Sequence, residues 1–227
     1  GLSGITANPL VGRVSDRLVD MGASALLAEI PEMFGAEEIM FRRCANADVQ
    51  QKLPAMVSDF KSYFVHHGEK VYENPSPGNK AGGITTLEEK SLGCVQKGGR
   101  TPVQDVLLYG QRVHTRGLTV LQTPGNDLVS TTALAAAGAH IVLFTTGRGT
   151  PFSGPVPTLK IATNTALAQH KPRWIDFNAG TLTQGASWDD ATEALVELLL
   201  ATASGAPTCS ERLGCREIAI WKDGVTL

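Results

Sequence analysis

The sequence predicts an α/β protein with a doubly wound, mostly parallel (Rossmann-like) sheet and helices on both faces. Short apolar runs without alternation, such as residues 23–29, are typical of strands that are buried on both faces. Helical patterns separate these runs, most regularly from residue 117 onward. Because parallel strands need crossover connections, this alternation favours a parallel sheet.

In the first third of the chain, capping residues and apolar spacing indicate three helices and one strand. An Asn-Pro pair before an apolar pattern is a typical helix start, and a glycine after it is a typical helix end. The predicted elements are a helix from Asn8–Pro9 to Gly22, a strand at 23–29, a short helix at 37–43, and a helix from Pro54 to Gly68.

The remaining elements begin with a capping signal. Thr85 with Glu88, and Thr86 with Glu89, both match the capping box, which predicts a helix that runs to about Gly98. The elements predicted after it are a helix from Thr101 through Val113, strands at 117–124, 139–147, 173–180 and 216–224, and helices at 127–138, 164–171 and 187–204.

The composition is that of an ordinary globular chain. It has 227 residues, of which 42% are hydrophobic, so it can bury a large core. The 20 Lys and Arg residues are balanced by 22 Asp and Glu residues, and no basic run is longer than two, which argues against a nucleic-acid or membrane partner. The four cysteines show no CxxC spacing, and no uncharged apolar run reaches the roughly 20 residues that span a bilayer. We therefore expect a cytoplasmic protein.

Three segments are expected. A first α/β lobe covers residues 1–72, a Gly/Pro-rich loop and helical segment covers residues 73–115, and a second α/β lobe covers residues 116–227. The chain opens without Met, directly before a helix, and the sequence lacks the parallel strand that should precede that helix. We expect a C-terminal fragment of a longer polypeptide whose N-terminal domain is missing.

Loops that follow predicted strands are the first candidate binding region, because ligands of open parallel sheets bind beyond the carboxyl ends of the strands. Asn126 stands where it either caps a helix or contacts a ligand. Arg148, in the same loop as Thr150, lies between two glycines, where its guanidinium would match a carboxylate or phosphate. A solvated surface arginine explains that position equally well.

The loop at residues 74–86 is the second candidate binding region. Glycines and threonines before a helix bring backbone N–H groups to its positive end, which favours an anion. A proline-stiffened loop with an ordinary capping box explains the threonines equally well, but not the adjacent Asn and Lys. The candidate residues are Asn79, Lys80, Gly82, Gly83, Thr85 and Thr86.

Carboxylates are better metal candidates than histidines in this sequence. Glu29 and Glu32 cluster beyond a strand end, where they could bind Mg²⁺, Mn²⁺ or Fe²⁺. His66 and His67 close a helix, and the other histidines are isolated. The common nucleotide-binding and serine-hydrolase motifs are absent, so no nucleotide cofactor is expected.

Four blocks of sequence identify a resemblance. Residues 1–19, 73–93, 123–151 and 216–227 are long and unusual blocks, and with them essentially the whole chain resembles the C-terminal portion of the altronate/galactarate dehydratase family. That family also includes the large subunit of sulfolactate sulfo-lyase. The second and last blocks favour the altronate dehydratase (altronate hydrolase) branch.

The resemblance implies a metal-dependent hydro-lyase. Such an enzyme dehydrates D-altronate to 2-dehydro-3-deoxy-D-gluconate with Fe²⁺ or Mn²⁺, and members of the family carry a further N-terminal part. A small sugar acid is then the expected partner, and we also expect a homo-oligomer. Alternatives are a galactarate-type dehydratase, a sulfolactate sulfo-lyase subunit, and a noncatalytic sugar-acid-binding domain.

For such a reaction the candidate residues take distinct roles. Lys80 is expected to be a base or electrostatic stabiliser, and Glu29 a catalytic residue and a metal ligand with Glu32. Arg148 and the backbone of Gly82, Gly83, Thr85 and Thr86 are expected to hold the carboxylate of the substrate, while Asn79, Asn126 and Thr150 orient its hydroxyl groups.

Overall fold

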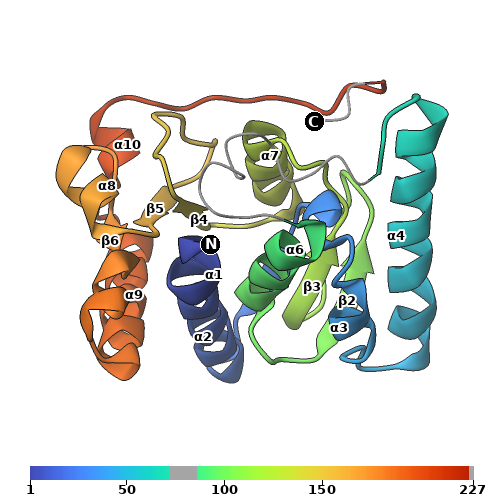
Figure 1. Ribbon diagram of the computed structural model, residues 1–227, viewed down its shortest axis with the longest axis horizontal. Coiled ribbons are helices and arrows are strands. Elements are labelled where there is room, and N and C mark those ends of the chain that lie inside the picture. Colours follow the sequence, from blue (N-terminus) through green and yellow to red (C-terminus); the bar gives the residue numbers. More distant parts are fainter. Residues whose placement is uncertain (72–85, 225–227) are drawn as a thin grey trace.

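The computed structural model describes residues 1–71 and 86–224, which form two parallel three-stranded sheets surrounded by helices (Figure 1). In the first sheet the order is β1-β3-β2, with β1 at Ser24–Leu27, β2 at Val103–Leu107 and β3 at Gly117–Leu121. In the second sheet it is β4-β5-β6, with β4 at Val142–Thr146, β5 at Thr158–Ala162 and β6 at Phe177–Asn178. All the pairs within these sheets are parallel, so the predicted parallel α/β class is confirmed.

Helices or loops connect the strands, and several helices begin at the caps that the sequence predicts. Asn126 and Ser187 each accept a hydrogen bond from the third residue beyond them, at the starts of α7 and α9. The helices of the described residues are α1 (Leu2–Ile5), α2 (Ala7–Asp20), α3 (Glu37–Phe41), α4 (Ala47–His66), α6 (Leu87–Val95), α7 (Asp127–Ala137), α8 (Thr165–His170), α9 (Trp188–Ala203) and α10 (Cys209–Arg212). Short 3₁₀ helices lie at Ile30–Met33, Gln96–Gly98 and Ala179–Gln184.

Two helices begin at other residues than predicted. Thr6 precedes α2, and its hydroxyl donates to the carbonyls of Leu2 and Thr163, whereas Asn8 lies inside the helix. Asn46 caps the long helix α4, so Pro54 lies in its interior and not at its start. A side-chain cap therefore sets the start of α4, whereas Thr6 makes no side-chain capping bond and is fixed by its contacts to Leu2 and Thr163.

The hydrophobic core has two main parts. Against the first sheet, Phe34 packs on Phe60 of α4 with ring centroids 6.5 Å apart, and the ring of Trp221 stacks on Phe60 with centroids 5.2 Å apart. Under the second sheet, Leu10 of α2 and Leu195 of α9 pack with β5. Each sheet thus packs against its own apolar cluster, and α2 lies between the two sheets in the view of Figure 1.

The helix predicted from Thr101 to Val113 is wrong, because its central residues form β2. Val103, Val106 and Leu107 are buried, and their backbone pairs with β3. The apolar spacing of this short segment fits a helix as well as a strand, and pairing with β3 decides between them.

Strand β5 has no counterpart among the predicted elements. Lys160 stands in the middle of this strand and interrupts the apolar run that would have identified it. The structure buries Lys160 completely, since its ammonium group donates to the carbonyl of Thr150 at 2.6 Å and to the hydroxyl of Ser210 at 2.9 Å. A buried lysine with hydrogen-bond partners is compatible with a central strand.

The final strand predicted at 216–224 is also wrong. This segment runs across the molecule from α10 towards α4 without joining either sheet (Figure 1). Its backbone N–H groups bond to other partners: Glu217 donates to the carbonyl of Ser153, and Ala219 donates to the hydroxyl of Thr132. The segment therefore links α7 to the connection between β4 and β5.

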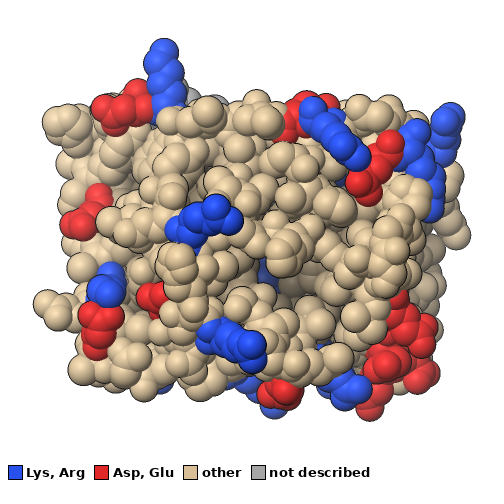
Figure 2. All heavy atoms as spheres, turned by 180° about the vertical axis from the view of Figure 1, so that it is seen from behind, with Lys and Arg blue, Asp and Glu red and all other residues tan. Residues whose placement is uncertain are grey.

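The surface matches the balanced composition. Figure 2 shows lysine, arginine and acidic side chains scattered over one face, with broad uncharged areas between them. Within the described ranges, none of the helices is long and apolar enough to cross a bilayer.

Candidate functional site

A cavity of about 1140 Å³ lies between the two sheets. Its walls include β1, β4, one side of α2 and parts of α6 and α7. Beyond the carboxyl end of β1, its lining becomes polar and carries Glu29, Glu32, Lys90, Cys94, Lys97 and Asp127. This set, which we call the carboxylate–lysine cluster, is in the position where open parallel sheets bind ligands.

Glu29 occupies a strained backbone position two residues after β1. Its φ of 66° makes it the non-glycine residue with positive φ in the described part of the chain. The turn is held from β3: the N–H of Glu29 donates to the hydroxyl of Thr123 at 2.7 Å, and the N–H of Ile30 donates to the carbonyl of Thr123. A left-handed glutamate costs roughly 1 kcal/mol or more, and such strain is concentrated at functional sites.

The carboxyl group of Glu29 is largely removed from water, with 18% of the side chain exposed. Ser130 of α7 donates to it at 3.3 Å, and the Lys97 ammonium lies 3.7 Å away. Burial raises the pKa of Glu29 to about 7; Lys97 opposes this change, while Glu32 and Asp127 reinforce it. A carboxyl group with this pKa can accept or donate a proton near neutral pH.

Lys97 sits in the 3₁₀ turn after α6. Burial disfavours its charged form, but Cys94, Glu29 and Glu32 outweigh that effect, so its pKa is raised and the ammonium stays charged. The turn is fixed against α2: a Cβ atom at Gly12 would come within 2.1 Å of the Gln96 carbonyl oxygen, so only glycine permits this packing. The cation is thereby held next to Glu29.

Glu32 is paired within the same cluster. Lys90 donates to one oxygen at 2.7 Å, and the Cys94 thiol lies 3.3 Å from the other. Burial raises the pKa of Cys94 to about 12, with Lys97 opposing and the carboxylates reinforcing the change, so this cysteine remains a thiol and acts as a hydrogen-bond donor.

The structure brings together only some of the site residues predicted from sequence. Glu29 and Glu32 line the cavity. The side chain of Asn126 caps α7 by accepting from the N–H of Val129, and that of Thr86 caps α6 by accepting from the N–H of Glu89. Both residues therefore form the helix caps that were the alternative to ligand binding. These bonds leave their predicted contact with substrate untested.

The other predicted substrate-binding residues are elsewhere. Arg148 and Thr150 follow β4, on the second sheet, and neither is part of the cavity wall. Arg148 is exposed, and the carbonyl of Thr150 accepts the hydrogen bond of Lys160. Asn79, Lys80, Gly82, Gly83 and Thr85 lie outside the described residues.

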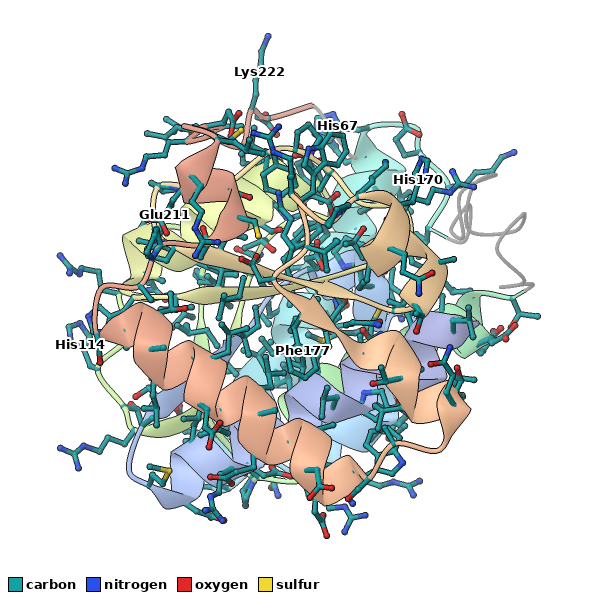
Figure 3. The ribbon with its side chains drawn as sticks, turned by 90° about the vertical axis from the view of Figure 1, so that its left-hand side faces the viewer. His67, His114, His170, Phe177, Glu211 and Lys222 are labelled. Carbon is teal, nitrogen blue, oxygen red and sulfur yellow. The ribbon has the colours of Figure 1, made fainter. Side chains whose placement is uncertain are left out.

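Glu29 and Glu32 do not make a complete metal site by themselves. In residues 1–71 and 86–224, no three or more His, Cys, Asp and Glu side chains are grouped so that they could hold a metal ion. Figure 3 shows His67, His114 and His170 at separate places on the outside of the molecule. The metal predicted from the resemblance would need further ligands from water, the substrate or other residues.

The lysines of the carboxylate–lysine cluster were not predicted from the sequence. Lys90, Cys94 and Lys97 are spaced four and three residues apart, which places them on one face of a helical segment. That face turns inward, whereas charged residues at helical spacing usually face solvent. Asn8 was also missed as a wall residue; it is 3% exposed, donates to the carbonyl of Gly93 and leaves its Oδ1 without a partner in the described residues.

These features together define a class of site. A buried carboxyl group with a near-neutral pKa, next to a fixed cation at the carboxyl end of a parallel sheet, is typical of an enzyme active site that moves a proton. We therefore interpret the carboxylate–lysine cluster as a candidate catalytic centre.

The comparisons identify the family. Residues 1–226 match the family described as "D-galactarate/Altronate dehydratase, C-terminal", and the chain belongs to that family. It is 56% identical over 227 residues to the altronate dehydratase of Escherichia coli (strain K12), and 57% identical over 232 residues to that of Bacillus subtilis (strain 168). All of this chain, but only 46% of each of those relatives, is covered.

A more distant relative is named for another substrate. The galactarate dehydratase (L-threo-forming) of Escherichia coli (strain K12) is 38% identical over 205 residues, which cover 89% of this chain and 39% of that protein. The high identity to altronate dehydratases thus favours their branch of the family.

Proposed function

We propose that the full-length protein that contains this chain is a hydro-lyase, which converts D-altronate into 2-dehydro-3-deoxy-D-gluconate and water. Family membership and identity above one half to two altronate dehydratases support this substrate. The observation in the structure that carries the proposal is the buried pair of Glu29 and Lys97 at the polar end of the cavity.

The reaction needs a base near a cation. The proton on C2, beside the carboxylate, must be removed, and the enediolate that forms must be stabilised. We assign the proton to the carboxylate of Glu29, which is suited to this role by its pKa of about 7 and is oriented by Ser130. Lys97 stabilises the negative charge that develops on the substrate.

The second half of the reaction expels the C3 hydroxyl group. That group takes up a proton and leaves as water, and the resulting enol then tautomerises to the 2-keto product. Lys80 remains our proposed source of further charge stabilisation, and Asn79 our proposed contact to a hydroxyl group. Carboxylate binding remains assigned to Gly82, Gly83, Thr85 and Thr86. Arg148, Asn126 and Thr150 remain proposed contacts to the substrate.

A divalent metal, Fe²⁺ or Mn²⁺, remains part of the proposal through the family resemblance. When bound, it would polarise the substrate carboxylate and hydroxyl oxygens. Glu29 and Glu32 could supply two ligands, and water, substrate oxygens or residues outside the described ranges could supply the others.

We also propose that the enzyme acts in the cytoplasm as a homo-oligomer. The four cysteines are free in the structure, which fits a reducing compartment. Light scattering of the purified full-length protein would report the oligomeric state directly.

The test is product formation by the full-length protein with a panel of substrates. D-altronate should give a 2-keto-3-deoxy acid in the presence of Fe²⁺ or Mn²⁺ and much less after chelation. Galactarate should react more slowly, and sulfolactate should release no sulfite. Preferred turnover of galactarate, or release of sulfite, would contradict the substrate assignment; binding of altronate without any turnover would contradict the enzymatic proposal.

A further inference from the structure

In each sheet of the described residues, the strand that faces the other sheet is paired on one side only. Strand β1 pairs only with β3, and β4 pairs only with β5, in the part of the chain that the structure describes. Each therefore has one edge whose backbone N–H and C=O groups lack a strand partner. Edges of this kind are ready to accept another strand.

The cavity lies against both of these edges. Its wall contains the six consecutive residues 23–28 and also the consecutive residues 140–145. Neighbouring side chains of a strand point to opposite faces of a sheet, so a cavity above one face would touch alternate residues. Contact with consecutive residues places the cavity beside the strand edges, within the plane of the sheets.

The burial of the strand residues also indicates that β1 and β4 each lack a neighbouring strand in the described sheets. All five residues of β3 and all five of β5 are buried, as expected for strands with neighbours on both sides. In β1 only Leu27 is buried, and in β4 only Val142, although most residues of both strands are apolar. Leu26, Leu143 and Phe144 are part of the cavity wall. Such continuous apolar runs are typical of central strands, not of outer ones.

The start of α2 is positioned to receive a strand. Thr6 is held at the carboxyl end of the second sheet by its hydrogen bond of 2.9 Å to the carbonyl of Thr163, which follows β5. From there α2 runs back along the sheets to β1. In a right-handed β-α-β unit, a strand before α2 would lie parallel to β1 and next to it.

We propose that the segment preceding residue 1 in the full-length protein supplies a β-strand that fills the cavity between β1 and β4 and joins both sheets into one parallel sheet. The matched family model is itself C-terminal, and this chain spans 46% of the two altronate dehydratases, so such proteins have ample chain for this strand. The inserted strand would stand where the strand order reverses, which is the usual ligand position of doubly wound folds.

The proposal has a consequence for the catalytic centre. The carboxyl end of the inserted strand would arrive beside Glu29, so the loop between this strand and α1 would form the remaining wall of the polar end. The strand itself would occupy only the apolar part between β1 and β4. This inference concerns the architecture and holds for any substrate of the site.

Hydrogen–deuterium exchange of the full-length protein tests the pairing. Backbone amides of residues 23–28 and 141–146 should exchange as slowly as those of the central strands β3 and β5, and at least about tenfold more slowly than those of the outer strand β2. Exchange of β1 and β4 as fast as that of β2 would overturn the proposal.

Photo-crosslinking identifies the strand that inserts. A diazirine analogue of leucine in place of Leu143 barely changes the side chain, and the same analogue at Leu118 of β3, which is 1% exposed, is the matched control. In a mixture of isotopically light and heavy full-length protein, Leu143 should crosslink within one polypeptide to residues that precede residue 1. The control should crosslink only to its neighbours in this chain. Crosslinks from Leu143 to a second copy, or only to residues of this chain, would overturn the proposed occupant.

Discussion

Both sheets hold charged groups that are largely removed from water, but in different states. At the second sheet, the Lys160 ammonium makes hydrogen bonds of 2.6 and 2.9 Å, and the carboxylate of Asp176 accepts backbone N–H bonds from Lys160 and Cys209. At the first sheet, Glu29 and Lys97 are 3.7 Å apart and both line a cavity. Burial alone therefore does not mark a catalytic group: short hydrogen bonds to fixed partners indicate a structural role, whereas longer contacts beside a cavity leave room for a substrate.

The same substitution in each lysine separates these two roles. Lys97→Met in the full-length protein should lower turnover of D-altronate by about 100-fold to 1,000-fold, because it removes the fixed cation that stabilises the enediolate. Initial rates at saturating substrate measure the effect. Turnover within about threefold of the wild type would show that Lys97 is not part of the catalytic centre.

Lys160→Met should have the opposite profile. Loss of its charged hydrogen bonds to Thr150 and Ser210 should destabilise the protein by roughly 1.5 to 3 kcal/mol, while turnover per folded molecule stays near that of the wild type. Thermal unfolding and active-site-normalised rates make the distinction. A large loss of turnover at unchanged stability would contradict the structural role of Lys160.

The pH dependence of stability tests the raised pKa of Glu29. Its pKa is about 7 in the folded protein and near 4.5 when solvated, so between these values the folded state holds a proton that the unfolded state has lost. The contribution of Glu29 to stability therefore falls as the pH rises through this window, and its charged form is a cost above it.

Glu29→Gln removes this cost because glutamine does not titrate. The variant should gain stability relative to the wild type by about 1 to 3 kcal/mol near pH 8, and little near pH 4.5. Apparent melting temperatures at both pH values measure the gain. The same difference at both pH values would mean that the pKa of Glu29 is not raised.

Asn126 offers the smallest effect. If its role is the cap of α7, Asn126→Ala should cost about 1 kcal/mol of stability, and Asn126→Ser should restore most of it with KM unchanged. A rise in KM with both variants would instead support the predicted contact with substrate. Steady-state kinetics and thermal unfolding of both variants decide the matter.

Local signals predicted much of the fold but only part of the site. Caps such as Ser187 and the apolar runs around β3 and β4 are visible in the sequence because short-range hydrogen bonds and burial leave a pattern. Strand β5 escaped because Lys160 masks its apolar run, and β2 was assigned wrongly because pairing with β3 decides its structure. These errors arise from tertiary contacts.

The candidate site was likewise predicted only where local sequence signals locate it. Glu29 and Glu32 were predicted because they follow a strand end, which sequence can locate. Lys97 was not predicted, because it reaches Glu29 through the close packing of Gly12 against the Gln96 carbonyl. This packing joins segments that are far apart in the sequence. Sequence indicates which edge of the sheet is used, whereas packing determines which cation reaches it.

The most direct test of the central claim is the rate of 2-keto-3-deoxy acid formation from D-altronate by the full-length protein and its Glu29→Gln variant. The matched control is Glu193→Gln, the same change in an exposed residue of α9. Glu29→Gln should be slower than the wild type by about 100-fold to 10,000-fold while Glu193→Gln keeps its rate. If Glu29→Gln turned over at the wild-type rate, Glu29 would not be the base, and the carboxylate–lysine cluster would not be the catalytic centre.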